Sequence, residues 1–326
     1  MKHTVFRLLA LALAVLMVVG MTACGAAQGG SAGNADGKFT IGICQFMPHP
    51  ALDKATEGFK AAVVAGLGEA NVTFEEQNAA GDSNTCSTIM NTFVSDDVDL
   101  IMANATNAVK AAQEATSEIP IVGTSVTDYV AAGLVDSNEK PGANVTGASD
   151  MNPVGVQVEL LQTLVPDAKT IGIVYCSAEE NSKVQAEEAK AAFEAKGYAV
   201  NIYTVADTNE INTVVTKACS EVDAFYEPTD NLIAANVPAM SNITTPAGKP
   251  VITGEESMCK SGFLATYSIS YYDLGCKAAE MAYEILVNDA DPATMPIFQF
   301  DSSTLNLVIN EQNAKELGIE IPDSLK

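Results

Sequence analysis

Residues 39–67 read FTIGICQFMPHPALDKATEGFKAAVVAGL, and this stretch decides the fold. Its first part, 39–44, is a short apolar run that ends at Gln45, a pattern typical of a buried strand. After the loop Pro48-His49-Pro50 comes a segment whose apolar residues repeat at helical spacing. The apolar face of that segment consists of Leu52, Phe59, Val63 and Leu67. The stretch therefore predicts a strand, a loop and a helix.

The same unit recurs along the rest of the chain. The further strands of the first half are predicted at 72–76, 100–103 and 120–123. After an interruption at 141–147, those of the second half are predicted at 170–175, 198–204, 223–226 and 250–253. Helical patterns or turn-rich segments separate them. The alternation predicts an α/β fold with two doubly wound parallel sheets, each with helices on both faces.

The composition is strongly acidic, with 41 Asp and Glu against 17 Lys and Arg and a formal net charge of −24. A phosphate backbone would be repelled from almost any face of such a molecule, so nucleic acid is excluded as a partner. The same negative charge repels the chain from an anionic lipid surface, so it stays at a membrane only if a covalent anchor holds it there.

The amino terminus predicts such an anchor. Basic residues precede the apolar run 8–19, which is typical of a signal peptide over residues 1–23. Met21-Thr22-Ala23-Cys24 resembles the lipobox at which bacteria attach lipid to Cys24, and residues 24–37 have the composition of a flexible tether. We expect an exported chain, anchored by that lipid to the outer face of the bacterial cell membrane. The alternative is a simple membrane anchor with an incidental cysteine.

The chain carries no motif for metal binding or catalysis that we recognise. Beyond Cys24, the chain has cysteines at 44, 86, 176, 219, 259 and 276, and none of them forms a C-x-x-C pair. The sequence therefore gives no support for a zinc or iron–sulfur site. It does not decide whether one or two disulfides form. His49 is the only histidine beyond the signal segment. We therefore expect no enzyme, no metal and no cofactor.

Polar residues follow the predicted strands. Open parallel sheets bind ligands beyond the carboxyl ends of their strands, where helix amino termini converge. Such a lining suits a small zwitterion whose ammonium meets an acid and whose carboxylate meets hydroxyl and N–H groups. The candidate ligand-binding residues are Gln45, Asn104, Thr106, Thr127 and Asp128 in the first half, and Asn181, Ser182, Thr229, Asp230, Asn231 and Glu255 in the second.

Each of these residue types also has an ordinary structural role, because Ser, Thr, Asn and Asp after a strand cap helices. Asp230 either takes the amino group of a ligand or caps the helix that begins at Asn231, and we favour the ligand contact. Asn181 and Ser182 hold a carboxylate or cap the next helix, and both readings stay open. His49, between two prolines, is expected to shape its loop.

A set of short motifs carries a family resemblance over nearly all of residues 38–326. In chain order they are Gly42-Ile43-Cys44-Gln45, His49-Pro50-Ala51-Leu52-Asp53, Gly58-Phe59, Ala80-Gly81-Asp82, Ile119-Pro120-Ile121-Val122, Val126-Thr127-Asp128, Asn144-Val145-Thr146-Gly147, Glu180-Asn181-Ser182, Pro228-Thr229-Asp230-Asn231 and Tyr271-Tyr272-Asp273-Leu274-Gly275. The chain thus resembles the tryptophan-binding type of ABC transporter substrate-binding lipoprotein. That resemblance implies a monomer with the type I periplasmic-binding-protein fold, which closes on an aromatic amino acid (tryptophan, phenylalanine or tyrosine) and delivers it to a membrane permease and its ATPase.

The resemblance also implies a topology of two lobes joined by three crossings. Lobe one comprises 38–147 plus 271–292, and lobe two comprises 148–266 plus 296–326. Within the second lobe, 296–300 and 305–309 are expected to form a late strand pair. The alternative functions are a ligand-sensing receptor domain of the same fold, or a binding protein for another small polar solute such as a branched-chain amino acid or a sugar.

Overall fold

The structure is a computed structural model that describes residues 37–326. The predicted signal peptide, the lipid site Cys24 and nearly all of the tether lie outside the described residues. Within 37–326, no helix has both the length and the apolar content that are needed to cross a membrane. The described residues fall within one unit by their internal contacts.

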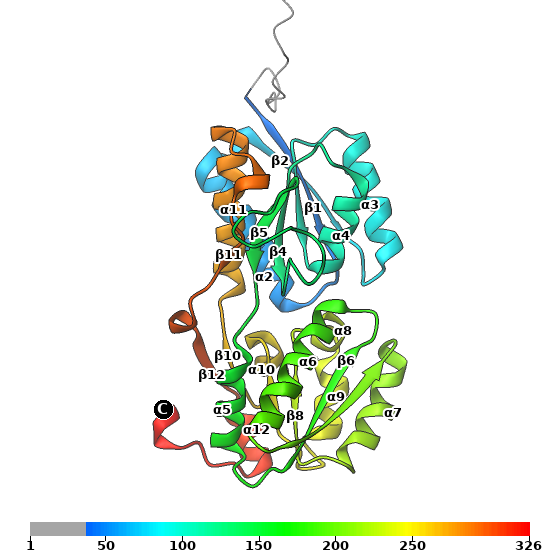
Figure 1. Ribbon diagram of the computed structural model, residues 1–326, viewed down its shortest axis with the longest axis vertical. Helices are drawn as coiled ribbons and strands as arrows, with labels where there is room; N and C mark the ends of the chain where they lie inside the picture. The colour runs from blue at the N-terminus through cyan, green and yellow to red at the C-terminus, as the bar shows by residue number, and fades with distance from the viewer. Residues whose placement is uncertain (1–36) are drawn as a thin grey trace, which may run out of the picture. The chain divides into compact units, whose positions relative to one another are not determined.

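The first sheet contains six strands in the order β11-β5-β4-β3-β1-β2, all paired in parallel (Figure 1). Its strands are β1 (Phe39–Gln45), β2 (Val72–Asn78), β3 (Leu100–Asn104), β4 (Ile121–Val126), β5 (Val145–Ser149) and β11 (Phe298–Gln299). Gln45 pairs with both Asn78 and Asn104, so the three strands end at one level. Polar residues at these ends therefore share one edge of the sheet.

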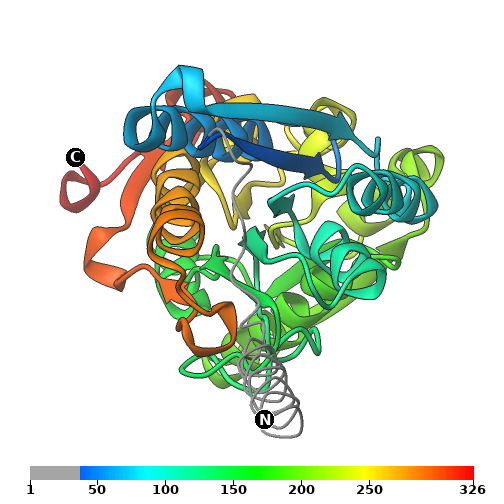
Figure 2. The same ribbon diagram turned by 90° about the horizontal axis from the view of Figure 1, so that it is seen from above.

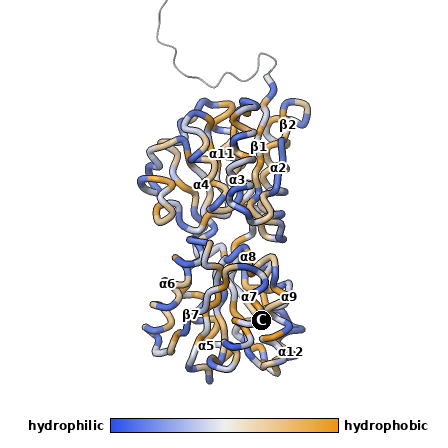
Figure 3. Tube along the Cα trace, turned by 90° about the vertical axis from the view of Figure 1, so that its right-hand side faces the viewer, coloured by the Kyte–Doolittle hydropathy of each residue, from blue (hydrophilic) through white to orange (hydrophobic). Residues whose placement is uncertain are grey.

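Helices cover both faces of the first sheet, and each face has its own hydrophobic core. The helices are α2 (Pro50–Leu67), α3 (Ser83–Ser95), α4 (Thr106–Ala115) and α11 (Tyr271–Asn288). One core contains Phe93 of α3 and Val109 of α4, and the other contains Phe59 of α2 and Ala282 of α11. Seen from above, the orange α11 lies beside the blue α2 (Figure 2). Hydrophobic residues gather in the interior strands (Figure 3).

The second sheet repeats this plan with the order β12-β10-β9-β8-β6-β7, and only β12 runs antiparallel to its neighbour. Its strands are β6 (Thr170–Cys176), β7 (Ala199–Val205), β8 (Ala224–Glu227), β9 (Val251–Thr253), β10 (Ala265–Ser268) and β12 (Asn306–Ile309). Its helices are α5 (Val154–Leu164), α6 (Glu180–Ala195), α7 (Thr208–Cys219), α8 (Asn231–Ala235), α9 (Val237–Thr244), α10 (Glu256–Ser261) and α12 (Glu311–Leu317). Two hydrophobic cores lie on its two faces, so the predicted doubly wound α/β fold is confirmed.

The chain passes between the sheets three times, at 150–153, 269–270 and 300–305. The predicted late strand pair is wrong, because β11 pairs with β5 in the first sheet and β12 pairs with β10 in the second. The reason lies in the short 3-10 helix η3 (Ser302–Thr304), which separates the two segments so that each extends the open edge of a different sheet. The other 3-10 helices are η1 (Glu69–Asn71), η2 (Pro292–Thr294) and η4 (Asp323–Leu325).

The six cysteines of the described residues are free thiols. Five of them are buried and Cys276 is partly buried. A hydrogen bond with the Cys86 thiol, together with burial, raises the pKa of the Cys44 thiol. Cys44 and Cys86 pack in a core of the first sheet, and Cys219 packs in a core of the second sheet.

Candidate functional site

The polar ends of the two sheets meet through direct side-chain contacts. The contacts are His49 Nε2 to Asn231 Oδ1 at 3.1 Å, Thr127 Oγ1 to Thr229 Oγ1 at 3.3 Å, and Asn152 Nδ2 to the Gly254 carbonyl oxygen at 2.7 Å. Each joins a residue at the strand ends of the first sheet, or at the first crossing, to a residue at the strand ends of the second. The strand ends that the sequence predicts as a binding site therefore face one another.

A small cavity lies among these contacts. Both sheets contribute to its lining, which is His49, Leu52, Ser125, Asp150, Thr229, Asp230, Asn231, Ala234, Glu255 and Tyr271. The space for the centre of a water-sized molecule is about 10 Å³, which is room for a single water. An amino acid is far larger than that, so a ligand of this size enters only when the walls move apart.

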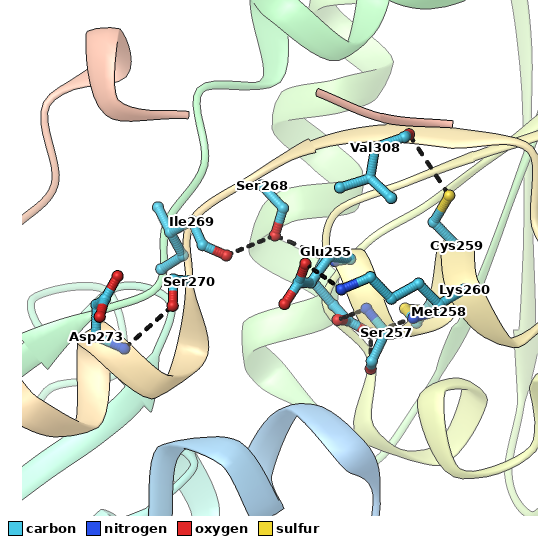
Figure 4. A network of polar contacts seen from close by, with 11 residues as sticks. Glu255, Ser257, Met258, Cys259, Lys260, Ser268, Ile269, Ser270, Asp273 and Val308 are labelled. Carbon is cyan, nitrogen blue, oxygen red and sulfur yellow. Dashed lines mark hydrogen bonds and ion pairs between the residues drawn. The ribbon is translucent and has the colours of Figure 1, made fainter. Parts of the chain in front are cut away.

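Buried carboxyl groups dominate the wall from the second sheet. Glu179 accepts hydrogen bonds from the Asn231 N–H at 3.0 Å, from Asn231 Nδ2 at 2.6 Å and from the Leu232 N–H at 2.9 Å. Glu255 accepts from the N–H groups of Ser257 and Met258 at the start of α10 (Figure 4). The amino termini of α8 and α10 are thus already occupied by carboxylates of the protein.

Asp230 also belongs to this wall and is fully buried. It caps α8 by accepting from the Ile233 N–H at 2.8 Å, and its second oxygen accepts from the Cys176 N–H at 2.7 Å. The Ser182 hydroxyl lies beside the same carboxylate. The capping role that the sequence left open for Asp230 is therefore present in the structure.

Burial raises the pKa of four buried carboxyl groups here, those of Asp150, Glu179, Asp230 and Glu255. The pKa of Glu179 rises to about 8, with the nearby charge of Asp230 adding to the effect of burial. Burial raises the pKa of Glu255 to about 7 and that of Asp150 to about 6. The ion pairs found in the described residues involve other carboxylates. An ammonium group brought into the cavity would therefore favour the ionised forms of these carboxyl groups, with which the described residues form no ion pair.

The wall from the first sheet has the opposite polarity. The helix α2 begins after His49, which lines the cavity and does not cap the helix with a side-chain hydrogen bond. The Ser125 hydroxyl is buried and has no hydrogen-bond partner among the described residues. Free N–H groups at a helix amino terminus and a nearby hydroxyl suit a carboxylate. The two walls together suit the two charged ends of an amino acid.

Four of the predicted site residues line the cavity, and the others lie around it. Thr229, Asp230, Asn231 and Glu255 are in the lining. Thr127 is buried and contacts Thr229. Thr106 is buried with a hydroxyl that has no partner among the described residues.

The remaining predicted residues bond to the protein itself. Gln45 donates to Asp53 at 2.7 Å and accepts from the Thr56 hydroxyl, while Asn104 donates to the Leu52 carbonyl oxygen at 2.8 Å; both hold α2 against the sheet. Asp128 accepts from two N–H groups of its own turn. Asn181 donates to the Thr229 carbonyl oxygen and to Ser182, so these two residues support the wall from behind.

Sequence reasoning missed several lining residues. Asp150 accepts from the Tyr271 hydroxyl at 2.7 Å, and its other oxygen has no partner among the described residues. Asp150 directly follows β5, which overlaps the interruption predicted at 141–147, so no strand end is predicted beside it. His49 was assigned only to its loop. Leu52 and Ala234 are apolar, so a search for polar residues does not find them. The only polar group of Tyr271 is its hydroxyl.

The chain is similar to known transport proteins over almost its whole length. The model of the family described as ABC transporter substrate binding protein matches residues 40–326. A tyrosine-binding protein of Clostridioides difficile is 38% identical over 323 residues, which is 96% of this chain and 93% of that protein.

Two solved structures are similar in sequence and in fold. An ABC domain from Streptococcus pneumoniae in complex with L-Trp has 38% identity and a TM-score of 0.85, over 88% of this chain and 97% of that chain. The ligand-free, open structure of a substrate-binding protein with adhesive properties from Clostridium difficile has 40% identity and a TM-score of 0.68, over 87% of this chain and 96% of that one.

Proposed function

The chain belongs to the family of ABC transporter substrate-binding proteins, and from that premise we propose that it captures an aromatic amino acid, tyrosine or tryptophan, and delivers it to the permease of an importer. Members of this family act outside the cytoplasm, bind solutes and are not enzymes. The tyrosine-binding relative and the structure in complex with L-Trp support the choice of an aromatic ligand.

The observation that carries the proposal is the cavity between the two sheets. Its lining combines carboxyl groups from one wall with an uncapped helix amino terminus from the other, which suits an ammonium and a carboxylate respectively. Leu52, Ala234 and the ring of Tyr271 supply apolar surface in the same lining. A small zwitterion with an apolar ring fits this combination better than a sugar or an ion.

We propose that the two lobes close on the ligand about the crossings at 150–153, 269–270 and 300–305. The first lobe is the sheet that contains β5 and β11 with its helices, and the second lobe is the other sheet with its own. The TM-score is 0.85 against the complex with L-Trp and 0.68 against the ligand-free, open structure, although the identities are similar. That difference supports a closed arrangement here, from which the lobes open to admit the ligand.

We also propose that the chain is exported by the signal peptide 1–23 and held at the membrane by lipid on Cys24. Mass spectrometry of the protein from a bacterial host tests this proposal. The expected product begins at Cys24 and carries lipid, and Cys24→Ser is released from the membrane fraction. Retention of residues 1–23, or a wild-type Cys24 without lipid, contradicts it.

The absence of Trp from the chain allows a direct test of the ligand. L-Tryptophan is titrated while the solution is excited at a wavelength that only indole absorbs. We expect a saturable blue shift of the emission as the ring leaves water. Thermal melts with tyrosine, phenylalanine, leucine and glucose then rank other ligands. Unchanged indole emission, together with no thermal shift from any aromatic amino acid, would contradict the proposed function.

A further inference from the structure

His49 has a structural position that its role in a loop does not explain. It precedes the first residue of α2, lines the cavity and is 6% exposed. Its Nε2 lies 3.1 Å from Asn231 Oδ1, so it joins the two sheets. The question is which of its ring nitrogens carries a proton.

The hydrogen-bond network answers that question. Asn231 Nδ2 donates to Glu179 at 2.6 Å, which fixes the amide orientation and leaves Oδ1 as the atom that faces His49. Because Oδ1 only accepts, His49 Nε2 must donate. Burial lowers the pKa of His49, and the hydrogen bond to Asn231 and the charge of Asp53 oppose that effect only in part. The ring is therefore neutral, and Nδ1 carries a lone pair.

This lone pair has no partner in the part of the chain that the structure describes. Nδ1 is buried without a hydrogen bond. His49 also makes no side-chain hydrogen bond that caps α2. A buried acceptor without a hydrogen-bond donor destabilises the protein, and a ligand that donates to it removes that cost.

We propose that His49 Nδ1 accepts a hydrogen bond from the side chain of the ligand, from an indole N–H or a phenol O–H, and thereby selects tryptophan or tyrosine over phenylalanine. The inference rests on the proposed function and adds the ligand group that is recognised. Two apolar residues in the same cavity offer a surface for the ring of the ligand. Leu52 lies three residues after His49 in α2 and Ala234 lies three residues after Asn231 in α8, and both line the cavity.

The ammonium of the ligand has better acceptors than a neutral imidazole. Asp150 and Glu255 line the same cavity, and one oxygen of Asp150 has no partner among the described residues. A hydrogen bond from an ammonium to a carboxylate is stronger than one to an uncharged nitrogen. Nδ1 is therefore left for a donor on the side chain.

The test uses calorimetric titration of the full chain with matched pairs of ligands. One pair is L-tryptophan and its benzothiophene analogue, in which sulfur replaces the indole N–H; the other is L-tyrosine and L-phenylalanine. We expect the ligand with the donor to bind at least about ten-fold more tightly in wild type, because a site that hydrogen-bonds a substrate rejects an analogue without the donor. In His49→Phe, which keeps an aromatic ring without an acceptor, the ratio should fall to within about two-fold.

Different results would overturn the role of Nδ1 and the proposed function. If wild type binds both members of each pair equally, or if His49→Phe weakens all four ligands by the same factor, the role of Nδ1 is overturned while aromatic amino acid binding stands. If no aromatic amino acid binds wild type, the proposed function falls and this inference falls with it. A second readout needs no variant: the ¹⁵N resonance of His49 Nδ1 should shift with tryptophan, and an equal shift with the benzothiophene analogue contradicts the proposal.

Discussion

At the scale of single residues, Asp230 shows how a buried carboxylate holds together the ends of two elements. Its two oxygens accept from the N–H groups of Cys176 and Ile233. In Asp230→Ala both N–H donors lose their acceptor in the interior, which lowers the free energy of unfolding by about 1–3 kcal/mol for each donor. Loss of the charge repulsion between Asp230 and Glu179 offsets part of this cost. We expect the melting temperature to fall by roughly 5–10 °C, measured by circular dichroism.

Asp128→Ala is the matched control for this prediction. Asp128 also accepts from two N–H groups, those of Val130 and Ala131, both at 2.9 Å. It is only partly buried, so water can replace its oxygens, and we expect a loss below about 1 kcal/mol. Equal melting temperatures for the two variants would show that burial does not distinguish the two carboxylates.

The chemistry of the site could be predicted from the sequence better than the directions of its side chains. Thr229 and Glu255 follow strands whose apolar pattern is clear, and both line the cavity. Gln45 also follows such a strand, but its amide turns toward α2, where Thr56 and Asp53 complete its hydrogen bonds. That choice depends on how the helix packs on the sheet, which the residue type at a strand end does not reveal. The ligand contacts of all these residues stay predictions.

At the scale of elements, the return of the chain to the first sheet depends on two glycines. A Cβ atom on Gly58 of α2 would lie 2.0 Å from the Tyr272 carbonyl oxygen, and one on Gly275 of α11 would lie 2.0 Å from the Ala55 carbonyl oxygen. Because both obstacles are backbone, Ala at either position forces the helices apart. We expect Gly58→Ala and Gly275→Ala each to cost about 3 kcal/mol or more in chemical denaturation.

Gly155→Ala controls for the substitution itself. Gly155 lies in the first turn of α5, and no atom stands within 4 Å of a Cβ built on it. Alanine has the higher helix propensity, so we expect this variant to gain up to about 1 kcal/mol. If the variants at positions 58 and 275 are as stable as this one, the close approach of α2 and α11 is not required.

The central strands β1 and β3 could be predicted from the sequence, whereas β5 and the edge strands β11 and β12 could not. β3 is a buried apolar run, and its pattern is sufficient. β5 is equally buried, but its sequence is Val145-Thr146-Gly147-Ala148-Ser149, and such small residues are also typical of a turn. Gly147 is there because a Cβ atom would lie 2.1 Å from the Gly123 carbonyl oxygen of the next strand. The short β11 and β12 are strands only through their neighbours, so a local pattern does not find them.

At the scale of the whole molecule, the buried carboxyls make stability depend on pH in an unusual direction. In the unfolded chain, the carboxyl groups of Glu179 and Glu255 have lost their protons by pH 6.5, since the ordinary Glu pKa is 4.5. The folded chain holds them until about pH 7 for Glu255 and about pH 8 for Glu179. Between pH 6.5 and 8 the folded state therefore binds more protons, and raising the pH lowers the free energy of unfolding.

We expect a loss on the order of 2–3 kcal/mol between pH 6.5 and 8.5 without ligand, from 1.36 kcal/mol for each pH unit over which a group keeps its extra proton. Below pH 6.5 neutral His49 acts in the opposite direction, because its folded pKa is lowered. Thermal melts across this range measure the slope. Glu179→Gln should remove most of the slope between pH 7 and 8 and leave the part near pH 7 that Glu255 causes. A slope that Glu179→Gln leaves unchanged would assign the effect to other groups.

The most direct test of the central claim is a crystal structure of the protein grown with L-tryptophan or L-tyrosine. We predict one ligand molecule in the cavity between the sheets, with its ring beside Leu52 and Ala234, its ammonium beside Asp150 and Glu255, and contacts from both lobes. A ligand bound outside this cavity, or held by one lobe alone, would contradict the account.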